Sequence, residues 1–195
     1  MGFKQVLIVQ GWKSKPDDNW APWLTDQLEA REVLVSVPSL SRADIPRPKD
    51  WIEAIKVFML CGPDENTFFV THSLGCMATL LYLEQLPEDI RVGGLVIVAG
   101  FCEHNASDRH ERRESRAFFA RPLDYEKIRR MVTKGIVAIQ STDDPFVPYE
   151  KHSKILEEKL GAKIITIEHG GHLNSRIGGY TMLPIALHEL IKMGC

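Results

Sequence analysis

Three polar residues in separate parts of the chain have the side chains that nucleophilic catalysis requires. Ser73 lies at the centre of THSLG (71–75), Asp144 lies in STDDPFVP (141–148), and His172 ends EHGGH (168–172). A serine hydroxyl is a weak nucleophile at neutral pH, so it needs an adjacent base and a third group that orients the base. Histidine and aspartate commonly fill these two roles. These residue types therefore indicate acyl transfer through a covalent serine intermediate.

The surroundings of Ser73 favour a sharp turn between a strand and a helix. A β-branched and aromatic run at 67–71 precedes it, and an apolar helical segment at 74–86 follows it. Such a turn exposes a nucleophilic hydroxyl when the residues two before and two after it are small. Gly75 satisfies this pattern, whereas Thr71 stands where G-x-S-x-G has glycine. A serine that merely caps the helix would occupy the same position.

Two adjacent carboxylates follow the apolar run at 136–140. Asp143 and Asp144 come just past its end, on the edge of the sheet where Ser73 is also expected. Either side chain could instead cap the turn or the following helix. The residues alone leave open which of the two carboxylates orients the base.

The base candidate follows the apolar run at 163–167. His172 comes after Gly170 and Gly171, which let the backbone turn freely and suit an imidazole held on a loop. His169 remains next to the strand, so we predict His172 as the general base. The two histidines also suggest a metal site, but they flank two glycines and no third ligand is evident. We therefore expect no metal and no cofactor.

The elements that must position these residues alternate along the chain. Six nearly continuous apolar runs read as strands, at 5–10, 33–37, 67–71, 95–99, 136–140 and 163–167. Helical segments are expected between and after them, at about 20–30, 48–60, 74–86, 123–133, 149–160 and 181–192. This alternation predicts an α/β fold, with a six-stranded, mostly parallel sheet and helices on both faces. We expect one domain over residues 1–195.

Ser73, Asp144 and His172 each follow a different predicted strand, and their order along the chain is that of the α/β-hydrolase fold. That chemistry also needs two backbone N–H groups directed at the developing oxyanion. Leu74, the residue after the nucleophile, would supply one. The loop after the first strand would supply the other, and we assign it to Trp12.

The motifs VTHSLGC (70–76), STDDPFVP and HGGH resemble those of the small serine hydrolases typified by retinoblastoma-binding protein 9 and the bacterial YdeN-like proteins. The similarity extends to NWAPWL (19–24) and FARPLDYEKI (119–128). The resemblance implies an α/β-hydrolase fold with a minimal cap and hydrolysis of carboxylic esters. It maps the nucleophile to Ser73, the base to His172 and the acid to Asp144.

Residues 101–122 form a connection that is longer than usual for an α/β domain, with five arginines and a Phe118-Phe119 pair. It reads equally well as a solvated surface loop or as a short lid over the carboxyl edge of the sheet. In the second interpretation Phe118 or Phe119 faces Trp12 across an apolar substrate pocket. Such a pocket would favour small or medium uncharged esters.

Composition excludes several classes of protein. The formal net charge is -2 and the isoelectric point is near 6.4, which provides no electrostatic basis for binding nucleic acid or a membrane surface. The four cysteines are widely spaced, so we expect reduced thiols and a cytoplasmic location. The segment after the first strand, GWKSK (11–15), matches no nucleotide-binding motif. The alternative to an esterase is a hydrolase fold that binds an unknown protein partner with vestigial catalysis.

Overall fold

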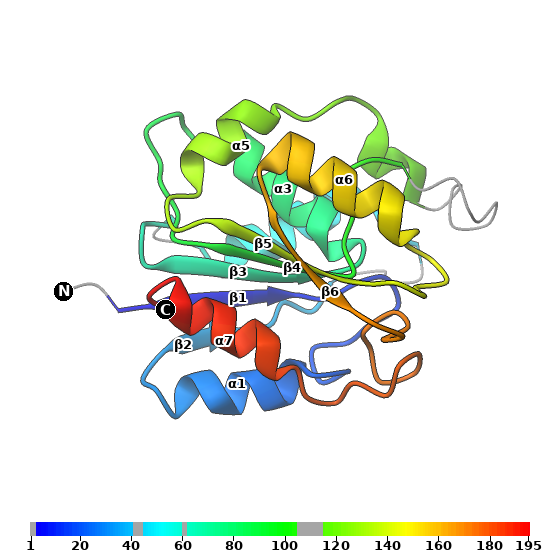
Figure 1. Cartoon of the computed structure of the whole chain (residues 1–195). Helices are drawn as coiled ribbons and strands as arrows, with labels where there is room; N and C mark the ends of the chain where they lie inside the picture. The colour runs from blue at the N-terminus through cyan, green and yellow to red at the C-terminus, as the bar shows by residue number, and fades with distance from the viewer. Residues whose placement is uncertain (1–2, 41–44, 60–61, 105–114) are drawn as a thin grey trace.

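The computed structural model describes residues 3–40, 45–59, 62–104 and 115–195, and these form a single six-stranded sheet with helices on both sides (Figure 1). All paired strands run parallel, in the order β2-β1-β3-β4-β5-β6. Their bounds are β1 Gln5–Val9, β2 Leu34–Ser36, β3 Thr67–His72, β4 Leu95–Val98, β5 Ile136–Ser141 and β6 Lys163–Ile167. The α/β-hydrolase type of fold and all six predicted strands are confirmed.

The strands are apolar on both sides because both faces of the sheet are covered. Every residue of β3, β4 and β5 is buried. Side chains alternate along β1, so that Leu7 and Val9 join one apolar core while Val6 and Ile8 join the other. The edge strands β2 and β6 are only partly buried.

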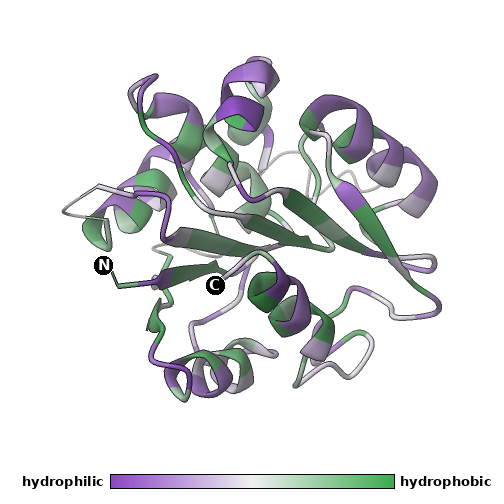
Figure 2. Ribbon diagram, turned by 60° about the vertical axis from the view of Figure 1, so that its left-hand side comes forward, coloured by the Kyte–Doolittle hydropathy of each residue, from purple (hydrophilic) through white to green (hydrophobic). Residues whose placement is uncertain are grey.

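Two layers of helices complete these cores. Four helices pack on one face: α2 Pro48–Val57, α3 Gly75–Gln85, α5 Tyr125–Met131 and α6 Tyr149–Leu160. Two helices cover the other face, α1 Ala21–Glu29 and α7 Pro184–Lys192. Figure 2 shows apolar strands between helices whose outward faces are hydrophilic. This arrangement follows from amphipathic helices that each bury one side against the sheet.

The observed helices lie within the predicted segments, with small differences at their ends. The largest difference at a start is in α7, which begins at Pro184 rather than at residue 181. Proline is favoured at the first helical position because its missing N–H would have no partner there. No helix within the described ranges is long and apolar enough to cross a membrane.

The long connection predicted at 101–122 is described only at its two ends. A short 3-10 helix, η1, spans Arg116–Phe119. Residues 105–114 lie outside the described residues, so the choice between a lid and a surface loop stays a prediction.

Candidate active site

The three residues singled out for catalysis follow the carboxyl ends of β3, β5 and β6. Ser73 comes directly after β3, Asp144 lies three residues past β5, and His172 lies five residues past β6. The arrowheads of the strands point to the right in Figure 1, so this edge of the sheet faces that side. Parallel strands bring these loops to one edge, which is where open α/β sheets place their ligands.

Ser73 occupies a strained turn between β3 and α3. Its φ is 52°, in the left-handed region that non-glycine residues rarely adopt. The Ser73 amide donates to the carbonyl of Val98 at 3.0 Å, and its own carbonyl accepts from the amide of Cys76 at 3.0 Å. The serine is therefore fixed from both sides while its residue stays half-exposed. This is the backbone expected for a nucleophile elbow.

Two glycines make room for this turn. A Cβ at Gly75 would lie 2.3 Å from the carbonyl oxygen of Val9, and one at Gly11 would lie 2.9 Å from Cβ of Ser73. The need for a small residue at position 75 is thereby confirmed. Thr71, at the other position of the pattern, is buried and its hydroxyl points to the carbonyl of Val96 at 3.5 Å. A threonine there is compatible with the elbow.

Asp144 and His172 form a buried pair. His172 Nδ1 lies 2.7 Å from Asp144 Oδ2, and the two side chains are 8% and 0% exposed. The other carboxylate oxygen, Oδ1, accepts from the amides of Phe146 at 2.8 Å and Val147 at 3.0 Å. These amides fix the orientation of the carboxylate, which in turn fixes Nδ1 of His172 as the protonated ring nitrogen. Nε2 is then left as the basic nitrogen.

Asp143 and His169, the alternative candidates for the acid and the base, lie outside the pair formed by Asp144 and His172. The His169 side chain is 84% exposed, and its Nδ1 lies 3.8 Å from Asp143 Oδ2. Asp143 Oδ1 accepts from the amide of Gly171 and from the hydroxyl of Ser141, both at 2.8 Å. These hydrogen bonds, the Gly171 amide first, hold the pKa of Asp143 below its usual value. Asp143 therefore stabilises the loop that carries His172. It is not part of the pair formed by His172 and Asp144.

Two further side chains hold the His172 loop, and neither was predicted to do so from the sequence. Nε2 of His72 donates to the carbonyl of His172 at 3.0 Å, and Nε1 of Trp20 donates to the carbonyl of Leu173 at 3.0 Å. The two donor rings are buried and meet edge to face. Burial, together with the nearby His172, lowers the pKa of His72 to about 3. Both residues lie in motifs that resemble the family, NWAPWL and VTHSLGC, but neither motif indicates a contact with the distant His172 loop.

A cavity of about 250 Å³ opens over Ser73. Ser73, His172, Leu74 and Trp12 all line it, so the structure brings the proposed nucleophile, base and oxyanion residues together. Within the described ranges the amide of Leu74 donates no hydrogen bond to the protein. The remaining lining residues are Lys13, Ser14, His72, Phe101, Ser115, Phe146, Asn174, Arg176 and Ile177.

The assignment of Phe118 and Phe119 to this cavity is corrected by the structure. Phe118 is 1% exposed and packs edge to face on Trp51 of α2, with ring centroids 5.3 Å apart. Phe119 stacks behind Phe101 at 5.8 Å instead of reaching the cavity. The aromatic residues that share the cavity with Trp12 are Phe101 and Phe146. The prediction from the sequence was wrong because the turn of η1 directs the Phe118 side chain into the core beneath α2 and α3.

Neither a cysteine nor a metal site competes with Ser73 in the described part of the chain. Cys76 is a free, buried thiol, and burial raises its pKa far above its ordinary value. A thiol held protonated in this way is a poor nucleophile. Among the described residues there is also no group of three or more His, Cys, Asp or Glu side chains that could hold a metal ion.

Comparison with known proteins shows the family of this chain. A family model described as serine hydrolase matches residues 6–192. The chain belongs to this serine hydrolase family. YdeN of Bacillus subtilis (strain 168) is 33% identical over 187 residues, which cover 96% of this chain and 94% of YdeN. The serine hydrolase RBBP9 of Rattus norvegicus is 28% identical over 147 residues, covering 75% of this chain and 68% of RBBP9.

Solved structures support the same family and fold. The crystal structure of the ydeN gene product from B. subtilis has a TM-score of 0.89 at 32% identity and covers 97% of this chain and 98% of its own. Est1E from Butyrivibrio proteoclasticus has a TM-score of 0.69 at 14% identity, covering 97% of this chain and 86% of its own. The second similarity is one of fold alone. The resemblance to the YdeN-like serine hydrolases predicted from the motifs is thus confirmed.

Proposed function

We propose that this serine hydrolase cleaves carboxylic esters of small or medium size through Ser73, His172 and Asp144. The observation that carries the proposal is the buried pair of His172 and Asp144, whose imidazole lines the same cavity as the elbow serine. An imidazole held by a carboxylate beside a strained serine is the arrangement that activates a hydroxyl.

The first half of the reaction acylates the enzyme. Nε2 of His172 accepts the proton of the Ser73 hydroxyl as Oγ attacks the carbonyl carbon of the ester. The carbonyl oxygen becomes an oxyanion, which the amides of Leu74 and Trp12 would stabilise. The C–O bond to the alcohol then breaks, and His172 returns its proton to the departing alkoxide. The products of this half are an alcohol and a Ser73 ester.

The second half regenerates the enzyme. His172 accepts a proton from water, whose oxygen attacks the acyl carbon. The bond between the acyl carbon and Ser73 Oγ then breaks, His172 returns its proton to Oγ, and a carboxylic acid leaves. In both halves the imidazolium is stabilised by the Asp144 carboxylate. The two oxygens of the Asp144 carboxylate accept hydrogen bonds from two amides and from His172 Nδ1, which hold the carboxylate against the imidazole.

The cavity supports the proposed size of substrate. Its volume of about 250 Å³ is slightly below the range of about 300–1,000 Å³ that is typical of ligand pockets, which favours a small substrate. Trp12, Phe101 and Phe146 supply apolar surface for an acyl or alcohol group. We further propose a cytoplasmic location, for which the free thiols of Cys76, Cys102 and Cys195 give support.

Turnover of 4-nitrophenyl acetate and butyrate by the wild type and Ser73→Ala tests the proposal. We expect saturable hydrolysis by the wild type and a loss of about a thousandfold or more in the variant. Equal rates for the two proteins would contradict it. That result would favour a hydrolase fold used to bind a partner, with vestigial catalysis.

A further inference from the structure

The cavity over Ser73 has an asymmetric charge. Lys13 and Arg176 line it, whereas no aspartate or glutamate does so among the described residues. The nearest catalytic carboxylate, Asp144, is buried and already accepts three hydrogen bonds. The mechanism described above uses neither cation.

Lys13 is held in place by a strained turn. Its φ is 61°, and the turn is closed by a hydrogen bond from the Ser14 amide to the Gly11 carbonyl at 3.3 Å. A left-handed conformation is uncommon for a lysine and concentrates at functional sites. The ammonium group lies 4.6 Å from the centroid of the Trp12 ring, a cation–π contact that keeps the charge beside the proposed oxyanion residue.

Arg176 lies on a loop whose conformation is also fixed by hydrogen bonds. Oδ1 of Asn174 accepts from the amides of Arg176 at 3.0 Å and Ile177 at 2.6 Å, and Asn174 and Gly178 form an isolated bridge. This turn presents both Arg176 and Ile177 to the cavity. Neither Arg176 nor Lys13 forms a salt bridge with any described carboxylate.

The loops that carry the two cations are tied together. Oδ1 of Asn19 accepts from the amide of Ser175 at 3.1 Å and from its hydroxyl at 3.0 Å. Asn19 in turn donates to the side chain of Gln10, at the end of β1, at 3.3 Å. The two cations are therefore presented to one cavity from a common, hydrogen-bonded scaffold.

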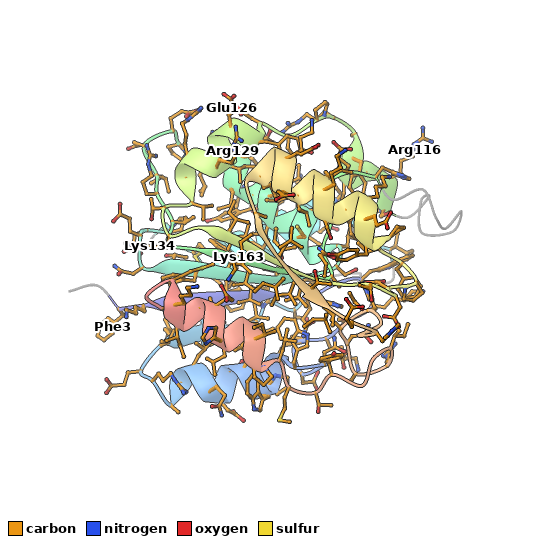
Figure 3. The ribbon with its side chains drawn as sticks, in the orientation of Figure 1. Phe3, Arg116, Glu126, Arg129, Lys134 and Lys163 are labelled. Atoms are coloured by element: carbon orange, nitrogen blue, oxygen red, sulfur yellow. The ribbon has the colours of Figure 1, made fainter. Side chains whose placement is uncertain are left out.

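Other nearby cations do not share this placement. Lys13 and Arg176 are exposed, as Arg116 and Lys15 are, but neither Arg116 nor Lys15 lines the cavity. Figure 3 shows the Arg116 side chain extending away from the body of the protein. Lys15 is only two residues from Lys13. Among the described residues, Lys13 and Arg176 are the cations that line the cavity.

We infer that the cavity selects esters that carry a second, anionic group, a carboxylate, a few atoms from the scissile carbonyl. Arg176 would bind that carboxylate with its planar guanidinium, and Lys13 would add a second charge from the opposite loop. This inference rests on the proposed ester hydrolysis and names its substrate class. It replaces the expectation from sequence that uncharged esters are preferred.

Two pairs of esters test the inference, one for each side of the scissile bond. On the acyl side, mono-4-nitrophenyl glutarate is compared with 4-nitrophenyl pentanoate. On the alcohol side, 3-carboxyphenyl acetate is compared with phenyl acetate. We expect kcat/KM to favour the anionic member about tenfold or more in one pair, mainly through KM, and the preference to shrink in high salt.

The variants assign the preference to particular residues. Arg176→Gln and Lys13→Gln should each reduce the ratio of kcat/KM between the anionic and neutral esters about tenfold. Lys15→Gln removes the same charge from the same loop but outside the cavity, so it should leave the ratio unchanged. A reduction in Lys15→Gln as large as in Lys13→Gln would overturn the inference in favour of a general field.

The outcome also separates this inference from the function on which it rests. Turnover of the neutral esters without anionic preference in either pair overturns the inference and leaves the hydrolase intact. An absence of turnover with all four esters, together with an unreactive Ser73, overturns both.

Discussion

The ring of His72 lies against the ring of His172, with centroids 4.9 Å apart, and its Nε2 donates to the His172 carbonyl at 3.0 Å. His72 directly precedes the elbow serine, so this hydrogen bond joins the proposed nucleophile to the loop of the proposed base. The carbonyl oxygen can only accept, so Nε2 of His72 carries the proton. The separation between Ser73 and His172 is thus set in part by a neutral histidine.

We predict that His72 acts as a positioning residue. His72→Leu removes the donor and should lower kcat about ten- to a hundredfold with little change in KM, because the substrate contacts remain while the imidazole is misplaced. His72→Gln can still donate an N–H and should recover part of the loss. Ester kinetics and thermal melting of both variants provide the measurement. Similar kcat values for the two variants, with equal melting temperatures, would argue against positioning.

We predict that His172 is essential and His169 is not. His172→Ala should lower kcat about a thousandfold or more, because it removes the imidazole that lines the cavity and is paired with Asp144. His169→Ala removes an exposed ring and should change kcat less than about threefold. Hydrolysis of 4-nitrophenyl butyrate by the two variants measures the difference. A larger loss for His169→Ala would show that the base is wrongly assigned.

We predict that Asp144 is essential for catalysis and that Asp143 is not. In Asp144→Asn the amides of Phe146 and Val147 should retain the amide oxygen at the Oδ1 position, which turns the NH2 group toward His172 Nδ1. That contact favours the wrong tautomer, and kcat should fall by about 10³ to 10⁴. Asp143→Asn keeps an acceptor for Ser141 and Gly171 and should be mild.

The two aspartate variants are compared by kcat and by the pH dependence of kcat. A greater loss in Asp143→Asn than in Asp144→Asn would reverse the assignment of the acid.

Acid should destabilise the protein through two buried histidines. Burial lowers the pKa of His152 to about 4, assisted by Lys151 and opposed by Asp144, and the pKa of His72 is about 3. Each ordinary value is 6.5, so between 6.5 and these values the unfolded chain binds protons that the folded protein does not. The free energy of unfolding is therefore highest above pH 6.5 and falls as pH decreases, by about 1.4 kcal/mol per pH unit for each group.

Urea unfolding of the wild type and His152→Leu between pH 7 and pH 4 measures this dependence. His152 is well suited to the substitution, because neither ring nitrogen has a hydrogen-bond partner among the described residues. The free energy of unfolding should depend less steeply on pH in the variant, by the amount that corresponds to the uptake of about one proton on unfolding. If the free energy of unfolding changes equally with pH in the two proteins, His152 is not a source of the acid sensitivity.

The sequence was sufficient for the fold because its evidence is local. Each predicted strand is a short apolar run, and Pro87 and Gly161 mark the helix ends where the structure also ends α3 and α6. Buried parallel strands and amphipathic helices leave this pattern in any sequence. Gly75 was also predictable, because the crossing of β1 and α3 leaves no room for a side chain.

The details of the cavity were less predictable because they depend on contacts between distant segments. Phe118 or Phe119 was expected to face Trp12 across the cavity, but Phe118 lies in the core and Phe119 lies behind Phe101. Arg176 was not identified, since only its loop geometry brings it to the cavity. Trp20 contacts Leu173 across 153 positions of sequence, which no local motif encodes.

Covalent labelling of Ser73 tests the central claim most directly. A working triad makes this hydroxyl far more reactive than an ordinary serine, so a fluorophosphonate should react with it once per molecule. Peptide mass spectrometry of the native protein locates the adduct, with His172→Ala as the unreactive variant and His169→Ala as its matched control. We predict one stoichiometric adduct on Ser73, lost in His172→Ala and retained in His169→Ala. An unlabelled folded protein, or label spread over surface serines, would contradict the account.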